Sequence, residues 1–216
     1  MVSRVTVTNS IMNEQLSLLE IPPAPIRRYS GPVHKYCLFL AIFPDRCTAQ
    51  RIIAFANMFR QKQRMHGKIR PLNHLHVSLC PIGRTLNVPE TVAGTVVDDV
   101  CKAVAKVTSP FEINFDWVTS FGGPPGNRPI VLFDNNRGNE GVRRLYELLH
   151  AGFAKCDPLN SENSKFSPHV TFLYGNRELA PVPIEPVRWT AKEVVLVCSE
   201  TGATKYLLLH RWELGQ

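Results

Sequence analysis

The sequence predicts a protein of mixed helices and strands that is built as two similar lobes. A histidine, an apolar residue and a hydroxyl residue occur together twice, as His76-Val77-Ser78 and His169-Val170-Thr171. Each string lies in a run of β-branched and aromatic residues that is typical of a strand. Each also follows an apolar strand, a helix and a loop in the same order. A duplicated lobe with a pseudo-twofold axis would bring the two histidine strands face to face across a cleft.

The spacing along the chain supports the same interpretation. Leu38, in the first apolar strand, precedes His76 by 38 positions, and Val131 precedes His169 by the same number. A duplicated lobe is the simplest explanation of this agreement, and chance is the alternative.

The first lobe is expected to open with a buried strand. The apolar run 35–43 ends at Pro44-Asp45, which is typical of the start of a helix. Apolar residues at a helical period predict that helix over about 47–65. After the first histidine string, a loop leads into a second helix over about 89–106, which carries four valines on one face.

The second lobe is expected to contain two strands before its helix. Residues 111–118 alternate between apolar and polar as a half-buried strand does, and 129–134 form a second, buried strand. A helix is expected over about 140–155, because its leucines and valine fall on one face. The runs 193–200 and 205–214, joined by a Thr-Gly turn, predict a terminal hairpin.

The chain has 216 residues, a length that suits one domain. Residues 1–33 are polar and then proline-rich, so we expect a poorly ordered N-terminal extension with a brief helix near 12–19. Residues 34–216 are expected to form a single bilobal domain. Oligomeric state is not encoded in any of these patterns, and a monomer is the simplest expectation.

Charge and cysteine usage narrow the range of partners and compartments. The net charge of +7 favours anionic partners such as nucleic acid or nucleotides. The six cysteines are scattered without a C-x-x-C pair, which is typical of a reducing, cytoplasmic protein. No apolar stretch approaches the roughly 20 residues that cross a bilayer, and no secretory signal opens the chain, so we expect no membrane partner.

The two strings carry groups suited to phosphate chemistry. Side chains alternate along a strand, so the histidine and the hydroxyl of each string share a face while the valine points away. Two imidazoles on opposite sides of a phosphorus atom can act as base and acid, because an imidazole has a pKa of about 6.5. The hydroxyls of Ser78 and Thr171 can hold the phosphoryl oxygens.

Other residues are candidates for metal or substrate binding. His74 and His76 form an H-x-H pair, but no carboxylate or cysteine nearby in the sequence completes a metal site, so no metal and no cofactor are expected. His74 is instead predicted to be a loop or edge residue. Arg84 and Arg177 each lie six positions after a string's hydroxyl residue, which predicts phosphate contacts at the cleft mouth or, alternatively, solvated arginines. Tyr174 could stack on a base.

The paired strings and their flanking segments resemble the 2H phosphoesterase superfamily, specifically its bacterial 2′-5′ RNA ligase / RNA 2′,3′-cyclic phosphodiesterase family. The resemblance covers nearly everything after the N-terminal extension, including CLFLAIFPD, LHVSLCPIG, FDWVTSFGGPPGNRPIVL and FSPHVTFLYGNR. It implies an α+β, bilobal duplicated fold in which two antiparallel sheets form a V-shaped cleft with helices outside.

The resemblance also implies a reaction. This is the metal-independent hydrolysis of 2′,3′-cyclic phosphate ends of RNA or nucleotides to 2′-phosphomonoesters. His76 would donate a proton to the departing 3′ oxygen, His169 would activate water, and Ser78 and Thr171 would hold the phosphoryl oxygens. Ser78 departs from the family's more usual threonine, but it keeps the hydroxyl. Two alternatives remain open, RNA 2′-5′ ligation as the main activity and a non-catalytic nucleotide- or RNA-binding module.

Overall fold

The computed structural model describes residues 34–134, 138–156, 166–203 and 205–216. The expected N-terminal extension, 1–33, with its helix near 12–19, lies outside the described residues. Within the described part, no helix is long and apolar enough to cross a membrane.

Three α-helices, a 3₁₀ helix and nine strands make up the described chain. In order they are β1 (Tyr36–Ile42), α1 (Arg46–Lys62), β2 (Gly67–Ile69), η1 (Leu72–His74), β3 (Val77–Thr85), α2 (Val96–Val107), β4 (Phe111–Ser120), β5 (Arg128–Phe133), α3 (Glu140–Cys156), β6 (His169–Gly175), β7 (Val182–Ala191), β8 (Glu193–Glu200) and β9 (Tyr206–Glu213).

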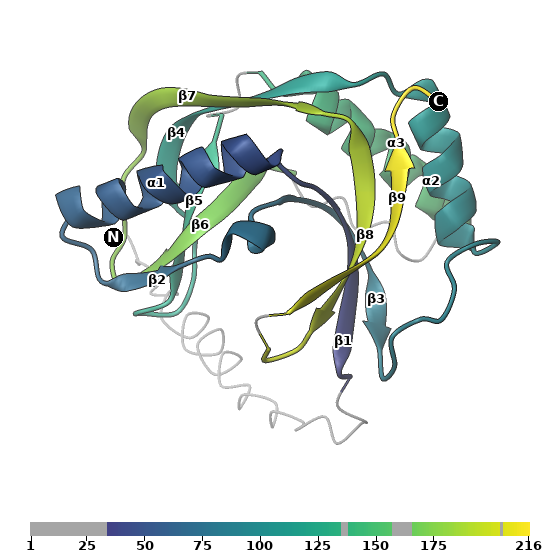
Figure 1. Cartoon of the computed structure of the whole chain (residues 1–216), viewed down its shortest axis with the longest axis horizontal. Helices are drawn as coiled ribbons and strands as arrows, with labels where there is room; N and C mark the ends of the chain where they lie inside the picture. The colour runs from purple at the N-terminus through teal and green to yellow at the C-terminus, as the bar shows by residue number, and fades with distance from the viewer. Residues whose placement is uncertain (1–33, 135–137, 157–165, 204) are drawn as a thin grey trace, which may run out of the picture. The chain divides into compact units, whose positions relative to one another are not determined.

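The strands form an antiparallel sheet of two halves. The strand order is β7-β4-β5-β6-β3-β1-β8-β9, and the short strand β2 pairs with the end of β6, at residues 173–175. The halves meet between β6 and β3 through one residue pair, Val77 with Val170. Figure 1 shows β4 to β7 on the left and β1, β3, β8 and β9 on the right. The expected α+β fold is confirmed. The two expected sheets are joined into one sheet by the pairing of Val77 with Val170.

The two halves are related strand by strand, but not by the spacing that the sequence suggested. Reading outward from the junction, β3-β1-β8-β9 corresponds to β6-β5-β4-β7. Ala41 pairs with Ser78, and Val131 pairs with Thr171. Leu38, however, pairs with Gly83. Leu38 and Val131 are therefore not equivalent positions, and their common distance of 38 residues to a histidine is a coincidence.

Helix α1 begins at a capping aspartate. The carboxylate of Asp45 accepts hydrogen bonds from the backbone N–H and the hydroxyl of Thr48, at 2.9 and 2.7 Å, and these bonds lower the pKa of Asp45. Ala49, Ile52 and Phe59 then recur at helical spacing on the buried face. This face packs on β2, β6 and β7, so α1 follows a strand of one half and covers the other half (Figure 1).

Helix α2 begins later than the sequence predicted. Its first residue is Val96, not a residue near 89, because Gly94 has a φ of 72° that is incompatible with a right-handed helix. Thr95 caps the helix by accepting a hydrogen bond from the backbone N–H of Asp98. Helix α2 packs on α3, β8 and β9, and α3 also contacts β3 (Figure 1). The expected helix over 140–155 is confirmed as α3, and the terminal hairpin is confirmed as β8 and β9.

Candidate active site

The two histidine strings lie at the junction of the two halves of the sheet. Val77 and Val170 are fully buried, whereas His169 and Thr171 are partly exposed and Ser78 is exposed. This confirms the expected alternation along each strand. In the antiparallel register that the valine pair sets, His76 faces Thr171 across the ladder and Ser78 faces His169. The junction therefore brings both strings together.

A cavity of about 310 Å³ lies over this junction. Five of the residues that the sequence singled out as site candidates line it, and these are His76, Ser78, His169, Thr171 and Tyr174. The sequence did not predict a site role for the other four residues of the lining, which are Arg70, His74, Pro129 and Tyr206.

Hydrogen bonds to the backbone fix both imidazoles. The Nδ1 of His76 lies 2.8 Å from the carbonyl oxygen of His74, and the Nδ1 of His169 lies 2.8 Å from that of Ser167. A carbonyl can only accept, so each Nδ1 carries a proton and each neutral ring has its lone pair on Nε2. The Nε2 of His76 lies 3.1 Å from the hydroxyl oxygen of Ser78. Nε2 is therefore the atom of each ring that can accept a proton, and in His76 it accepts a hydrogen bond from the Ser78 hydroxyl.

Aromatic rings pack against both histidines. The ring centroids of Phe39 and Phe43 lie 5.2 and 5.7 Å from that of His76, and the Phe121 centroid lies 4.7 Å from that of His169. These rings exclude water from one side of each imidazole. Burial and aromatic packing therefore hold two imidazoles in a partly dry pocket.

The pocket disfavours positive charge on its histidines. Burial lowers the pKa of His76 to about 4, with the nearby Arg70 guanidinium contributing, and burial also lowers the pKa of His169. The hydrogen bonds from each Nδ1 to a carbonyl act in the opposite direction. An anion bound in the pocket would act in the same direction as these hydrogen bonds and favour a protonated imidazole.

Arg70, His74 and Tyr206 form a second group along the same wall. The guanidinium of Arg70 donates to the Tyr206 hydroxyl at 2.9 Å and lies 3.2 Å from the Nδ1 of His74. The His74 ring stacks on Tyr206 with centroids 3.9 Å apart. Arg70 also lies 5.6 Å from the centroid of the Tyr174 ring. Arg70 thus presents a fixed positive charge to the pocket.

The prediction that His74 is a loop or edge residue is wrong. His74 lies in η1 with 2% of its surface exposed, held between Tyr206 and Arg70. The guanidinium beside its Nδ1 disfavours a metal cation there. Across the described ranges, no three His, Cys, Asp or Glu side chains are grouped so that they could hold a metal ion.

The structure places Arg84 and Arg177 differently, although both have the same spacing from a hydroxyl residue in the sequence. Strand β3 continues to Thr85 and carries Arg84 to a neighbouring cavity. Strand β6 ends at Gly175, and beyond it the exposed Arg177 donates to the backbone carbonyl of Gln63. Arg177 is not part of the lining of the two-histidine cavity.

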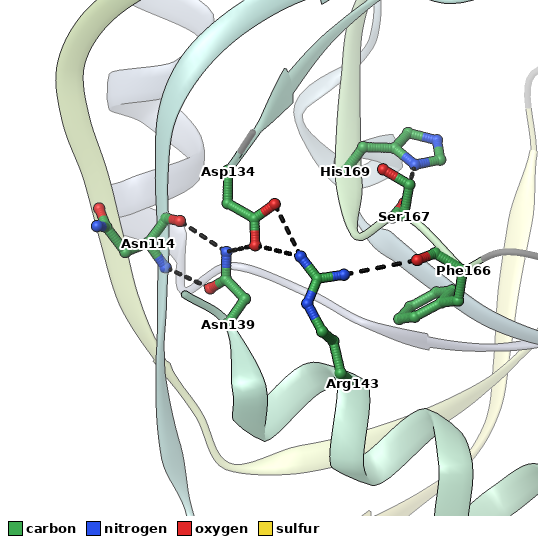
Figure 2. Close-up of polar contacts among 7 residues, drawn as sticks. All are labelled: Asn114, Asp134, Asn139, Arg143, Phe166, Ser167 and His169. Atoms are coloured by element: carbon green, nitrogen blue, oxygen red, sulfur yellow. Dashed lines mark hydrogen bonds and ion pairs between the residues drawn. The ribbon is translucent and has the colours of Figure 1, made fainter. Parts of the chain in front are cut away.

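A buried polar network stands behind the segment that holds His169 (Figure 2). Arg143 donates to both carboxylate oxygens of Asp134, at 2.9 and 2.7 Å, and its other terminal nitrogen lies 3.5 Å from the carbonyl oxygen of Phe166. The amide of Asn139 donates to Asp134 at 3.0 Å. The next residue after Phe166 is Ser167, whose carbonyl binds His169. The network therefore holds the backbone that orients this imidazole.

The fold and the pair of histidine strings match the pattern of the 2H phosphoesterase superfamily. A family model described as the 2′-5′ RNA ligase superfamily matches residues 48–202. The chain belongs to this superfamily. A search of the curated proteins found no match.

Solved structures show the same fold. TT0787 of Thermus thermophilus is 21% identical, with a TM-score of 0.67 over 83% of this chain and 98% of that chain. E. coli LigT in its apo form is 22% identical, with a TM-score of 0.61 over 85% of this chain and 99% of LigT. LigT complexed with 3′-AMP is 19% identical, with a TM-score of 0.62 over 84% and 99%. At these identities the likeness establishes the fold.

Replacing Arg70 with methionine is expected to raise the pKa of His76 above about 4, because a nearby positive charge is removed while burial is kept. The pKa of His74 should rise as well, since Arg70 also lowers it. The pKa of His169, which is lowered by burial, should change less than that of His76. Titration of the imidazole resonances by NMR measures all three groups. An unchanged pKa for His76 would show that Arg70 does not contribute to lowering it.

Proposed function

We propose that this protein is an RNA 2′,3′-cyclic phosphodiesterase that opens cyclic phosphate ends of RNA or nucleotides to 2′-phosphomonoesters. One observation carries the proposal. Two imidazoles fixed through Nδ1 line a single cavity of about 310 Å³, each beside a hydroxyl residue of its own string. An acid, a base and donors for phosphoryl oxygens are what hydrolysis of a phosphate ester requires.

The reaction assigns one role to each histidine. The Nε2 of His169 accepts a proton from water as the water oxygen forms a bond to phosphorus. The bond between phosphorus and the 3′ oxygen breaks, and Nε2 of His76 donates a proton to that oxygen. The bond to the 2′ oxygen remains, so the product is a 2′-phosphomonoester. Ser78 and Thr171 hold the non-bridging oxygens, whose negative charge grows in the transition state.

A bound substrate anion favours the protonated form of His76, which takes its proton from solvent. Without an anion beside it, His76 has a pKa of about 4, so the ring is neutral at pH 7. A cyclic phosphate is an anion, and beside His76 it offsets the field of Arg70 and favours the imidazolium. The acid therefore becomes protonated only when a phosphate is bound, and Arg70 contributes to binding that phosphate.

The solved structures of LigT support nucleotide binding by this fold. LigT was crystallised with 3′-AMP, with phosphate and with ATP, and this chain shares its fold. Here the rings of Tyr174 and Tyr206 line the cavity beside the histidines. An aromatic ring can stack on a base without selecting its identity, so we expect activity on all four nucleotides.

The test is product analysis with adenosine 2′,3′-cyclic phosphate and with an RNA that ends in the same group. We expect adenosine 2′-phosphate, identified by chromatography against the 3′-isomer, and undiminished activity in excess EDTA. Absence of turnover, or release of the 3′-isomer, would refute the proposal. A parallel reaction with an added 5′-hydroxyl RNA tests the alternative activity, because a dominant longer product with a 2′-5′ bond would make ligation the main function.

A further inference from the structure

A second cavity, of about 430 Å³, adjoins the two-histidine pocket. The two cavities share four lining residues, which are Arg70, His74, Tyr174 and Tyr206. The rest of the second lining comes from β1, β3, β8 and the turn after β8, namely Cys37, Arg84, Ser199, Glu200, Thr201, Gly202 and Ala203. Its size falls in the range of about 300–1,000 Å³ that is common for small-molecule sites.

One row of residues across four strands forms the floor of this second cavity. Arg84 on β3 pairs with Cys37 on β1, Cys37 pairs with Ser199 on β8, and Ser199 pairs with Tyr206 on β9. Residues paired in this way lie side by side on one face of a sheet. This row therefore presents, in order, a cation, a small residue, a hydroxyl and an aromatic ring beside the proposed catalytic pocket.

The second cavity carries a net positive charge, and one of its arginines, Arg84, is available to bind an anion. Arg84 is exposed, and no hydrogen bond or ion pair joins it to any residue in the described part of the chain. The carboxylate in the lining, Glu200, is 3.4 Å from the Lys35 ammonium, which offsets its charge. Arg70 presents a second guanidinium at the boundary between the two cavities. The site thus suits a phosphodiester flanked by a nucleoside.

We infer that the second cavity binds the nucleotide that precedes the cyclic phosphate, with Arg84 on the phosphodiester that links it to the terminal nucleotide. The inference rests on the proposed function and deepens it, because it makes the end of an RNA strand, not a free cyclic mononucleotide, the preferred substrate. Tyr206, whose ring is stacked on His74 on one face, borders this cavity, and the hydroxyls of Ser199 and Thr201 offer hydrogen bonds to the ribose or base.

The experiment compares two substrates that differ by one nucleotide. These are adenosine 2′,3′-cyclic phosphate and a diadenylate that ends in the same cyclic phosphate. We expect a higher kcat/KM for the diadenylate, and a loss of about tenfold in Arg84→Ala, the size expected for one charge-assisted hydrogen bond. Hydrolysis of the mononucleotide should be unchanged in that variant. Arg51→Ala is the matched control, because it removes an equal charge from an exposed position on α1.

A neutral linkage tests the same contact without changing the protein. With the wild-type enzyme, kcat/KM for a diadenylate with a methylphosphonate link should be lower than for the charged diadenylate by the same factor of about ten. For this neutral substrate, Arg84→Ala should lower kcat/KM no further. For the charged diadenylate, log(kcat/KM) should fall with the logarithm of the salt concentration more steeply for the wild-type enzyme than for Arg84→Ala. The two slopes should differ by about 0.7, the value for one phosphate contact on a single strand.

The outcomes separate this inference from the proposed function. Equal kcat/KM for both substrates, or an equal effect of Arg84→Ala on both, would overturn the second subsite and leave the cyclic phosphodiesterase intact. If neither substrate is turned over, both the second subsite and the proposed function are overturned. A loss confined to the charged diadenylate supports the subsite.

Discussion

Replacing His76 with alanine is expected to lower kcat/KM for opening of adenosine 2′,3′-cyclic phosphate by about 10²–10⁴-fold, the range that general acid–base catalysis contributes. His169→Ala should cause a loss of similar size. Both rings line one pocket with Nδ1 bonded to a backbone carbonyl, which leaves Nε2 as the reactive nitrogen, and each has a separate task in the proposed reaction. Steady-state kinetics on the purified variants measures the two losses.

The identity of the acid can be separated from that of the base by changing the leaving atom. With sulfur in place of the 3′ oxygen, the leaving group needs no proton to depart. His76→Ala should then recover most of its lost rate, whereas His169→Ala should not, because water must still be deprotonated. Recovery in His169→Ala instead would exchange the two roles. Recovery in neither variant would indicate that His76 only binds the phosphate.

A control and a combined variant complete the comparison. His66→Ala removes an exposed histidine outside both cavities and should keep the full rate. The variant that lacks both catalytic candidates should be little worse than either single variant, because residues that act as a unit give non-additive losses. A folded double variant that retains hydrolysis would contradict the proposed chemistry altogether.

The candidate site shows which features the sequence could reveal. His76, Ser78, His169 and Thr171 were predictable, because each string encodes its own face through the two-residue period of a strand. Arg70 was not, although it carries the charge of the pocket. It reaches the site because β2 pairs with β6 and the Arg70 backbone N–H then donates to the Phe172 carbonyl at 2.9 Å. A three-residue strand leaves no periodic signal in the sequence.

Spacing along the chain was the weakest guide. Arg84 and Arg177 share the same distance from a hydroxyl residue, but one stays on a strand and the other lies beyond the end of a strand. The equal distances from Leu38 and Val131 to the histidines likewise join positions that are not equivalent. Position in the ladder depends on bulges and strand lengths, which change register without leaving a pattern in the sequence.

One strand of the fold, β7, could not be predicted from the sequence because of its prolines. Strand β7 was not predicted, because Pro183 and Pro186 interrupt its alternating pattern and proline cannot donate to a ladder. β7 occupies an edge of the sheet, where only β4 pairs with it. The missing N–H groups can therefore be accommodated there, and Val187, Trp189 and Ala191 still alternate toward the core.

Replacing Arg143 with methionine is expected to lower the free energy of unfolding by up to about 3–5 kcal/mol, the usual cost of removing one member of a buried ion pair. The carboxylate of Asp134 is only 1% exposed and would keep the amide of Asn139 as a donor, but it would lose both hydrogen bonds from the guanidinium. Urea denaturation measures the change. Arg144→Met is the matched control on the next residue of α3.

The control tests burial separately from charge. Arg144 is 68% exposed and its pair with Glu147, at 3.7 Å, is worth about 0–1 kcal/mol at most on such a surface. If Arg143→Met were as mild as Arg144→Met, the network of Figure 2 would contribute little to stability. Arg143→Lys should fall in between, because lysine keeps the charge and loses the paired donors that match a carboxylate.

The same network predicts a catalytic effect that stability alone would not produce. Arg143 contacts the carbonyl of Phe166, and the adjoining Ser167 carbonyl fixes the Nδ1 proton of His169. Without that anchor the imidazole is less well aligned, so Arg143→Met should lower kcat under conditions where it is fully folded, while KM changes little. Because the Ser167 hydrogen bond raises the pKa of His169, weakening it should lower that pKa and shift the corresponding limb of the pH–rate profile to lower pH. A folded variant with an unchanged profile would confine Arg143 to a structural role.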